Sequence, residues 1–407
     1  MKVFPMPSFS LLENPAAAPA TPYGADQAAV LNAEGLAEAR AVISGWPGYA
    51  PTPLIEMPGL ARMTGVASIY YKDESQRFDL KSFKPLGGAY AVARLLLTEV
   101  PALAGVASVR ADDLLAGTYA EACRQITVTA ATDGNHGRAV AWGARMFGCT
   151  CVIFINEAVS TGRERAIAGF GATVRRNPGS FDDAVRTARA TALAQGWHVV
   201  PDTSLGTSGP SPRHVTQGYA VMAAEAIEQL GDTGPPTHLF VQAGVGGMAA
   251  ASCAEFWRTY GTQKPMVILV EPENAACWFA SLGAGEPVAV TGDLDSLMGG
   301  LACGEISRLA WSILRTGADA AMKLTDEPAA HAMRALADGT FGDAPLVAGE
   351  SGVAGLAGLL AAAGDATARR TLNLNETARI MLFGTEGATD PETYTDIVGR
   401  SPEAVAS

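Results

Sequence analysis

Short apolar runs of strand length alternate with longer amphipathic stretches through most of the chain, and this alternation constrains the fold more than any other feature. Strands are expected at residues 126–131, 151–155, 172–174, 197–200, 239–242, 267–270 and 380–383. Helices are expected at residues 136–147, 164–170, 181–194, 215–230 and 248–260. Regular alternation of this kind favours parallel sheets that are covered by helices. The chain is therefore predicted to belong to the α/β class.

Length and charge narrow the range of functions. With 407 residues, of which 48% are hydrophobic and 17% charged, the chain suits either two domains or one large α/β domain. Its net charge of −12 disfavours binding to nucleic acids, which requires a basic surface, and to anionic membranes. The sequence has no uninterrupted run of about 18 apolar residues, so we expect no membrane span. It begins without the long apolar core of a signal peptide, and we expect a cytoplasmic protein.

The chain contains six cysteines, and their spacing matches no zinc-binding pattern. The sequence therefore predicts no metal site. Because cytosolic redox conditions disfavour disulfides, we interpret the cysteines as reduced thiols of the core. They are Cys123, Cys149, Cys151, Cys253, Cys277 and Cys303.

A glycine-rich segment lies between the expected strand that ends at residue 242 and the helix that follows it. Backbone N–H groups of such a turn, at the start of a helix, bind phosphate groups. The pattern Gly244-x-Gly246-x-x-Ala249, with Glu271 about 20 residues further on, also fits the fingerprint of dinucleotide-binding proteins. This segment therefore leaves three alternatives open: a phosphate site of another kind, an NAD(P)-dependent oxidoreductase, and a tight turn without a ligand.

A second glycine pair, Gly87–Gly88, follows Lys84 and Pro85 and precedes a helical stretch. Schiff-base chemistry requires a lysine amine within bonding distance of an aldehyde, whereas a dehydrogenase requires no lysine at this point. Lys81 is the neighbouring alternative. The register ahead of the glycine pair favours Lys84 as the reactive lysine.

Three segments, in this order, resemble those of one enzyme class. Residues 82–89 (SFKPLGGA) resemble the S-x-K-x-x-G segment of the tryptophan-synthase-β/threonine-dehydratase class of pyridoxal-phosphate (PLP) enzymes. Residues 132–136 (TDGNH) resemble its substrate loop, and residues 244–248 (GVGGM) resemble its phosphate loop. The likeness extends from about Thr52 to Gly387, which is nearly the whole chain.

This resemblance implies the architecture of PLP fold type II, with two open parallel-sheet α/β domains and PLP bound between them. The large PLP-binding domain is expected to consist of residues 1–85 plus 221–407. A small α/β domain, residues 86–220, is expected to be inserted into it. A homodimer is implied by the same resemblance.

Within this class the sequence is most similar to the diaminopropionate ammonia-lyase family. The distinguishing residue is Asp133, which stands where the dehydratases have serine. Ser82, in contrast, is typical of the dehydratases, so a hydroxyl remains an alternative to an amine as the leaving group. Further matching segments are 72–75 (KDES), 201–203 (PDT), 300–304 (GLACG) and 384–387 (GTEG).

The resemblance assigns cofactor-binding roles to several residues. Lys84 is implied to form the Schiff base with PLP and to move the Cα proton. Asn135 is implied to bind the 3-hydroxyl group of PLP, and Thr385 to face its pyridine nitrogen; a helix cap and an ordinary strand end are the alternatives. His136 is interpreted as structural. The phosphate is assigned to the backbone N–H groups of Gly244, Val245, Gly246, Gly247 and Met248.

The substrate is expected to be a small amino acid. Thr132 and the adjacent N–H groups are expected to bind its carboxylate. Asp133 and Asp202 are predicted to be catalytic and to bind substrate, because a second ammonium group requires an anionic pocket. Asp133 is also implied to act as a base towards a substrate of opposite hand. An Asp-Gly turn at position 133 and a helix cap at position 202 are the alternatives.

Together these residues imply α,β-elimination of 2,3-diaminopropionate to pyruvate and ammonia through an aminoacrylate intermediate. A serine/threonine-type dehydratase, or a lyase for another β-substituted amino acid, is an alternative on the same fold. An NAD(P) oxidoreductase and a catalytically silent protein of this fold are more distant alternatives. Cys277 and Cys303 both flank segments assigned to the site, which leaves a disulfide between them open.

Overall fold

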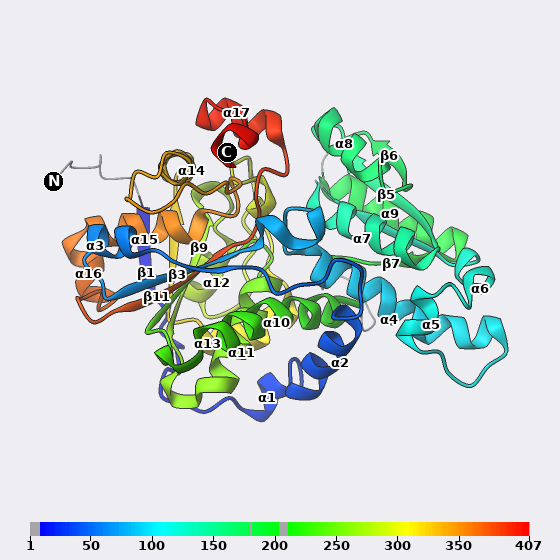
Figure 1. The fold of residues 1–407 in the computed structure, drawn as a ribbon, viewed down its shortest axis with the longest axis horizontal. Helices are drawn as coiled ribbons and strands as arrows, with labels where there is room; N and C mark the ends of the chain where they lie inside the picture. Colours follow the sequence, from blue (N-terminus) through cyan, green and yellow to red (C-terminus); the bar gives the residue numbers. More distant parts are fainter. Residues whose placement is uncertain (1–8, 133, 180, 203–210, 407) are drawn as a thin grey trace. The chain divides into compact units, whose positions relative to one another are not determined.

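The computed structural model describes residues 9–132, 134–179, 181–202 and 211–406, and the chain divides into two compact units (Figure 1). Unit 1 consists of Met1–Val30, Pro51–Ser82 and Met222–Ser407, and unit 2 of Leu31–Ala50 and Phe83–Val221. The sequence analysis placed the boundaries near residues 85 and 220. It left residues 31–50 in the larger domain, whereas the structure groups them with unit 2.

Unit 1 is built on a seven-stranded sheet in the order β1-β10-β9-β8-β11-β3-β2. The five inner strands are parallel, and the two edge strands pair antiparallel to their neighbours. The inner strand β8 is buried along its whole length, as the apolar run of Leu239, Phe240 and Val241 at its centre predicts. The strands are β1 (Phe9–Glu13), β10 (Ala320–Leu324), β9 (Met266–Pro272), β8 (His238–Gln242), β11 (Arg379–Gly384), β3 (Ser68–Asp73) and β2 (Leu54–Glu56).

The helices of unit 1 include α15, which lies directly on the sheet. A Cβ atom at Gly355 would lie 2.7 Å from the carbonyl oxygen of Phe240, so this glycine allows α15 to approach β8 closely. The helices are α1 (Ala25–Ala28), α3 (Pro58–Thr64), α11 (Gly247–Tyr260), α12 (Cys277–Ala284), α13 (Arg308–Gly317), α14 (Asp326–Ala337), α15 (Ala354–Gly364), α16 (Ala366–Thr371), α17 (Pro391–Val398) and α18 (Pro402–Ala406).

Unit 2 is built on a four-stranded parallel sheet in the order β6-β5-β4-β7. Its strands are β4 (Thr127–Ala131), β5 (Thr150–Asn156), β6 (Thr173–Asn177) and β7 (His198–Val199). Its helices are α2 (Ala33–Ile43), α4 (Lys84–Ala104), α5 (Ala111–Leu115), α6 (Ala120–Arg124), α7 (Asn135–Phe147), α8 (Thr161–Ala168) and α9 (Phe181–Gln195). The helix α10 (Ser211–Leu230) begins in unit 2 and ends in unit 1.

Among the described residues, α4 is the one helix long and apolar enough to cross a membrane by length and composition. More than half of its most apolar window, 56%, is buried inside the protein. Small residues pack it against α7, since a Cβ at Gly88 would lie 2.9 Å from the Cβ of Ala139 and one at Gly143 2.8 Å from the Cα of Ala89. This burial and close packing are typical of a core helix.

The α/β class is confirmed, and each strand and helix expected from the sequence is present with ends shifted by a few residues. The four strands that the sequence analysis did not predict all lie in unit 1. They are β1, β2, β3 and β10.

Candidate active site

Lys84 is the first residue of α4, and Pro85 follows it in the first turn, where a proline costs no hydrogen bond. Its Nζ atom lies 2.5 Å from Oδ2 of Asp202 and faces the rings of Phe83 and Tyr219, at 5.2 and 5.8 Å from their centroids. The side chain is 17% exposed. The lysine selected from the sequence is therefore a half-buried amine beside a carboxylate.

Asp202 contacts three side chains of unit 2. Besides Lys84, the Tyr219 hydroxyl donates to its Oδ1 at 3.0 Å, and Nδ1 of His136 lies 3.7 Å from the same oxygen. Burial alone would raise the pKa of Asp202, but the Lys84 ammonium, then His136 and the Tyr219 hydroxyl, outweigh this effect and lower the pKa to about 2. Asp202 is therefore an anion at neutral pH, with 28% of its side chain exposed.

The glycines of α4 and α10 explain how Tyr219 reaches Asp202. A Cβ at Gly218 would lie 1.9 Å from the carbonyl oxygen of Leu86, and one at Gly87 would lie 2.4 Å from the Tyr219 ring. The two helix backbones therefore touch at these glycines, and the aromatic ring lies against the turn that begins with Lys84. The glycine pair after Lys84 is thus required by packing.

The loop before α7 is held by Thr132. Its Oγ1 accepts hydrogen bonds from the backbone N–H groups of Gly134 and Gly137, both at 3.1 Å. Both N–H groups are therefore already used within the loop, and that of Gly134 is among the N–H groups adjacent to Thr132 that were expected to bind a substrate carboxylate. Asn135 is the first residue of α7, and the ring of His136 bonds through Nε2 to the carbonyl of Val200 at 2.8 Å. Asp133, which carries much of the substrate prediction, lies outside the described residues.

In unit 1 the glycine-rich segment connects β8 directly to α11. Gly246 is the N-cap of this helix, with φ +96°. Because glycine has no side chain that could accept a hydrogen bond, the N–H groups of the first turn of α11 have no side-chain cap. A Cβ at Gly246 would lie 2.2 Å from the ring of Trp278, and one at Gly244 would lie 3.2 Å from the carbonyl oxygen of Gly300. Position 246 therefore requires glycine and position 244 leaves little room for a side chain, and uncapped N–H groups at a helix start suit a phosphate.

The neighbouring helix α12 holds this loop through Trp278, whose indole N–H donates to the carbonyl of Gly244 at 3.0 Å. The start of α12 is in turn fixed by Glu271, which accepts the backbone N–H groups of Trp278 and Phe279, both at 2.8 Å. Burial raises the pKa of Glu271 to about 8, although these bonds oppose the rise. Both carboxylate oxygens are used in this way, so Glu271 is not available for a ribose, as a dinucleotide site would require.

Gln242, the last residue of β8, connects the glycine-rich segment to the end of β11. The two hydrogens on its Nε2 are shared among three acceptors, Oγ1 of Thr385 at 2.7 Å and the carbonyls of Gly352 and Phe383 at 3.1 and 2.9 Å. Because Thr385 accepts this bond, its own hydroxyl hydrogen can be donated to another acceptor. The sequence analysis did not identify Gln242, although its place directly before the glycine-rich segment was a usable signal.

The segment that leads to Lys84 is anchored beside Thr385. The N–H of Gly387 donates to the carbonyl of Lys81 at 2.9 Å, and Ser82 forms an isolated antiparallel bridge with Glu386. Lys81 itself has a left-handed backbone, with φ +57°. The Lys81 carbonyl therefore anchors the chain at a point three residues before Lys84, the first residue of α4.

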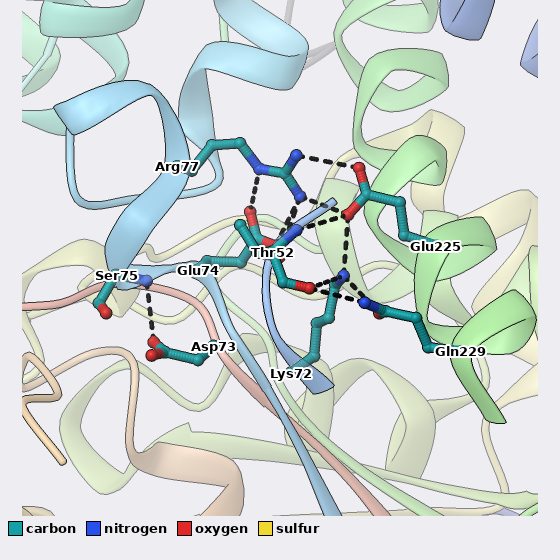
Figure 2. A network of polar contacts seen from close by, with 8 residues as sticks. All are labelled: Thr52, Lys72, Asp73, Glu74, Ser75, Arg77, Glu225 and Gln229. Carbon is teal, nitrogen blue, oxygen red and sulfur yellow. Dashed lines mark hydrogen bonds and ion pairs between the residues drawn. The ribbon is translucent and has the colours of Figure 1, made fainter. Parts of the chain in front are cut away.

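A buried network of charges lies at the start of the same segment (Figure 2). Arg77 pairs with Glu74 at 2.8 Å and with Glu225 of α10 at 2.7 Å, and Lys72 pairs with Glu225 at 2.8 Å. Thr52 joins the network through its hydroxyl, which bonds to Oε1 of Glu74 at 2.5 Å. The four charged side chains are at most 1% exposed. The two cations and two anions balance, which makes burial of the charges tolerable.

The part of the chain that the structure describes shows neither a cluster of metal ligands nor a disulfide bond. It contains no group of three or more metal-ligating side chains. Its cysteines form no disulfide, and Cys277 instead points its thiol at the Gly244 carbonyl, 3.8 Å away, and at Glu271, 3.6 Å away.

The features of the two units, taken separately, fit pyridoxal phosphate. Unit 1 contains a glycine cradle that any Cβ would fill, uncapped helix N–H groups, and the Thr385 hydroxyl, which can donate to a ring nitrogen. Unit 2 contains the Lys84 amine, which can condense with an aldehyde.

Comparison with known proteins agrees with this fit. Residues 46–375 match the family described as pyridoxal-phosphate dependent enzyme. The chain is 39% identical to the diaminopropionate ammonia-lyase of Escherichia coli K12 over 364 residues, which cover 88% of this chain and 90% of that protein. The crystal structure of the holo form from Escherichia coli has a TM-score of 0.86 at 34% identity and covers both chains completely. Another structure of that enzyme, in complex with an aminoacrylate–PLP azomethine reaction intermediate, has a TM-score of 0.83 at 35% identity and covers 96% of this chain and 97% of that one.

Proposed function

The chain belongs to the pyridoxal-phosphate-dependent enzymes and, among them, to the diaminopropionate ammonia-lyase family, and from this premise we propose that it eliminates ammonia from 2,3-diaminopropionate. The observation that carries the proposal is the contact between Lys84 and Asp202, at 2.5 Å. It places an anion beside the reactive amine, where a substrate with a second ammonium group needs one. Hydroxy amino acids have no such group to pair with it.

Several side chains and backbone N–H groups would hold the cofactor. Lys84 would hold its aldehyde carbon and Asn135 its 3-hydroxyl group. The N–H groups of residues 244–248 would hold its phosphate, and the Thr385 hydroxyl would donate to its pyridine nitrogen. When bound, PLP supplies an electron sink for the electrons of the broken Cα–H bond. A neutral partner such as Thr385 leaves the pyridine nitrogen unprotonated, which favours elimination over transamination.

The remaining steps are assigned to side chains of unit 2. Thr132 would bind the substrate carboxylate through its hydroxyl hydrogen, since its oxygen already accepts two backbone bonds. Lys84 would take the proton from Cα, and Asp133 would take it from a substrate of opposite hand. Asp202 would hold the ammonium group on Cβ until the Cβ–N bond breaks. Loss of ammonia leaves aminoacrylate, which hydrolyses to pyruvate and a second ammonia.

We further propose that the enzyme is a cytoplasmic homodimer. The acidic composition and the family support this proposal. Size-exclusion chromatography with light scattering measures the oligomeric state directly.

A spectrum and a coupled assay test the function. The purified protein should show a visible absorbance band and should release pyruvate from 2,3-diaminopropionate. Asp202→Asn should keep the band and lose most of the activity, because the neutral amide cannot pair with an ammonium group. An absorbance band without pyruvate release would support the cofactor assignment and contradict the substrate assignment. Serine and threonine would then be tested as substrates. Absence of a band after reconstitution with PLP would overturn the proposal.

A further inference from the structure

Tyr219 of α10 has no role in the reaction assigned above, yet its hydroxyl reaches the site directly. It donates to Oδ1 of Asp202 at 3.0 Å, while Lys84 occupies Oδ2 on the other side of the carboxylate. The residue is 1% exposed, so solvent does not compete for this bond. Asp202 is thus held from one side by a fixed neutral donor and from the other by a cation.

The position of Tyr219 is fixed by its surroundings. Its ring lies against Phe83, with centroids 4.7 Å apart, and fills the space that a side chain at Gly87 would need. The pKa of its hydroxyl is raised well above the usual value by burial and then by the charge of Asp202, so the hydroxyl keeps its proton throughout the working range. A donor that neither moves nor ionises is suited to orienting a carboxylate.

Lys84 and Tyr219 would be affected differently when the cofactor binds. If Lys84 held the cofactor, its nitrogen would no longer be an ammonium group that pairs with Asp202. Among the residues that the structure describes, Tyr219 is then the remaining hydrogen-bond donor to this carboxylate, with the His136 ring 3.7 Å away. The oxygen that Lys84 contacts here, Oδ2, would then be able to accept a hydrogen bond from the ammonium group of a substrate.

We propose that Tyr219 is a specificity-determining positioning residue, whose hydroxyl holds Asp202 so that the carboxylate meets the second ammonium group of a diamino acid. The inference rests on the proposed function, in that Asp202 binds this ammonium group. It adds a residue that acts only through Asp202. Substrates without a second ammonium group gain nothing from it.

Tyr219→Phe tests the proposal, because the substitution removes only the hydroxyl and keeps the ring that packs against Phe83. In the holoenzyme, KM for 2,3-diaminopropionate should rise about tenfold, as expected for loss of a hydrogen bond to a charged group, with kcat changed much less. Elimination from β-chloroalanine, which lacks a second ammonium group, should be unchanged. The visible cofactor band should also be unchanged. In the wild type the Tyr219 hydrogen bond lowers the pKa of Asp202, so its loss should raise this pKa and move the acid limb of kcat/KM for 2,3-diaminopropionate to higher pH.

Tyr394→Phe is the matched control, since the Tyr394 hydroxyl of α17 is also buried and has no hydrogen-bond partner among the described residues. It should leave both substrates unaffected. Equal losses on both substrates in Tyr219→Phe, or no loss on either, would overturn the proposal. If the wild-type enzyme converted β-chloroalanine but not 2,3-diaminopropionate, the proposed function itself would be refuted. This assay is made on the wild type, before any variant, so the two failures are distinguishable.

Discussion

Trp278 donates its indole N–H to the carbonyl oxygen of Gly244 at 3.0 Å, and its ring occupies the space that a side chain at Gly246 would need. The conformation of the glycine-rich segment is therefore set by a residue of the next helix, α12. A phosphate site formed by backbone N–H groups depends on how those groups are aimed. Residues that never touch the phosphate can thus determine how tightly it is bound.

Gly246→Ala should abolish retention of the cofactor. The new Cβ would lie 2.2 Å from the Trp278 ring, and alanine at φ +96° is strained in addition, so the segment must move. We expect a loss of about 3 kcal/mol in unfolding free energy and a protein purified without a visible absorbance band. Gly105→Ala is the control, because this residue has a left-handed helical backbone with φ +67° and nothing lies within 4 Å of the new Cβ. It should cost only about 1 kcal/mol and keep the band.

Glu271 should make stability depend on pH. Its pKa in the folded state is about 8, above its ordinary value of 4.5, so folding takes up a proton between these values. The contribution is complete below the ordinary pKa and is lost as pH rises through the folded one. Between pH 5 and pH 9 the unfolding free energy of the wild type, relative to Glu271→Gln, should fall by on the order of 4 kcal/mol. Urea unfolding at both pH values measures this difference. Glu286→Gln, at an exposed carboxylate, should show no such change.

Local patterns were sufficient to predict the α/β class, and the cofactor was implied by the family resemblance that the local motifs carry. A lysine ahead of a glycine pair and a glycine-rich turn between β8 and α11 are short-range features, and each has a direct chemical meaning. The family and the PLP dependence that these patterns indicated are confirmed. The roles of individual residues, Lys84 included, stay predictions.

Long-range contacts were beyond what the sequence could predict. The strand β1 was not predicted, because it pairs with β10, which lies far from it in the sequence. Glu271 fitted a dinucleotide fingerprint by spacing, and only the structure shows both of its oxygens used by the start of α12. Tyr219 lies in an ordinary helical pattern, and its meaning appears only where α10 meets the first turn of α4.

Breaking the buried charge network should be costly. Glu225 pairs with both Arg77 and Lys72, and burial lowers the pKa of Lys72 while the two carboxylates oppose this effect. Glu225→Gln leaves two buried cations facing one carboxylate, so we expect about 3–5 kcal/mol of lost unfolding free energy. Asp112→Asn, which breaks the exposed pair with Arg110, should cost no more than about 0.5 kcal/mol. A similar small loss for both variants in denaturant titrations would contradict the importance of the network.

Gly87→Ala should be destabilising although alanine is the better helix former. In an open helical position the substitution stabilises by up to about 1 kcal/mol. At Gly87 the new Cβ would lie 2.4 Å from the Tyr219 ring and 2.7 Å from the carbonyl oxygen of Val215, so α10 must shift away from the turn that begins with Lys84. We expect a net loss of about 2 kcal/mol and a fall of at least tenfold in kcat/KM. Gly162→Ala in α8 is the matched control, because its nearest neighbour is Oγ of Ser160 at 3.7 Å. It should raise the unfolding temperature and leave activity unchanged. If both substitutions stabilised the protein, the contact of α4 with α10 at Gly87 would be looser than described.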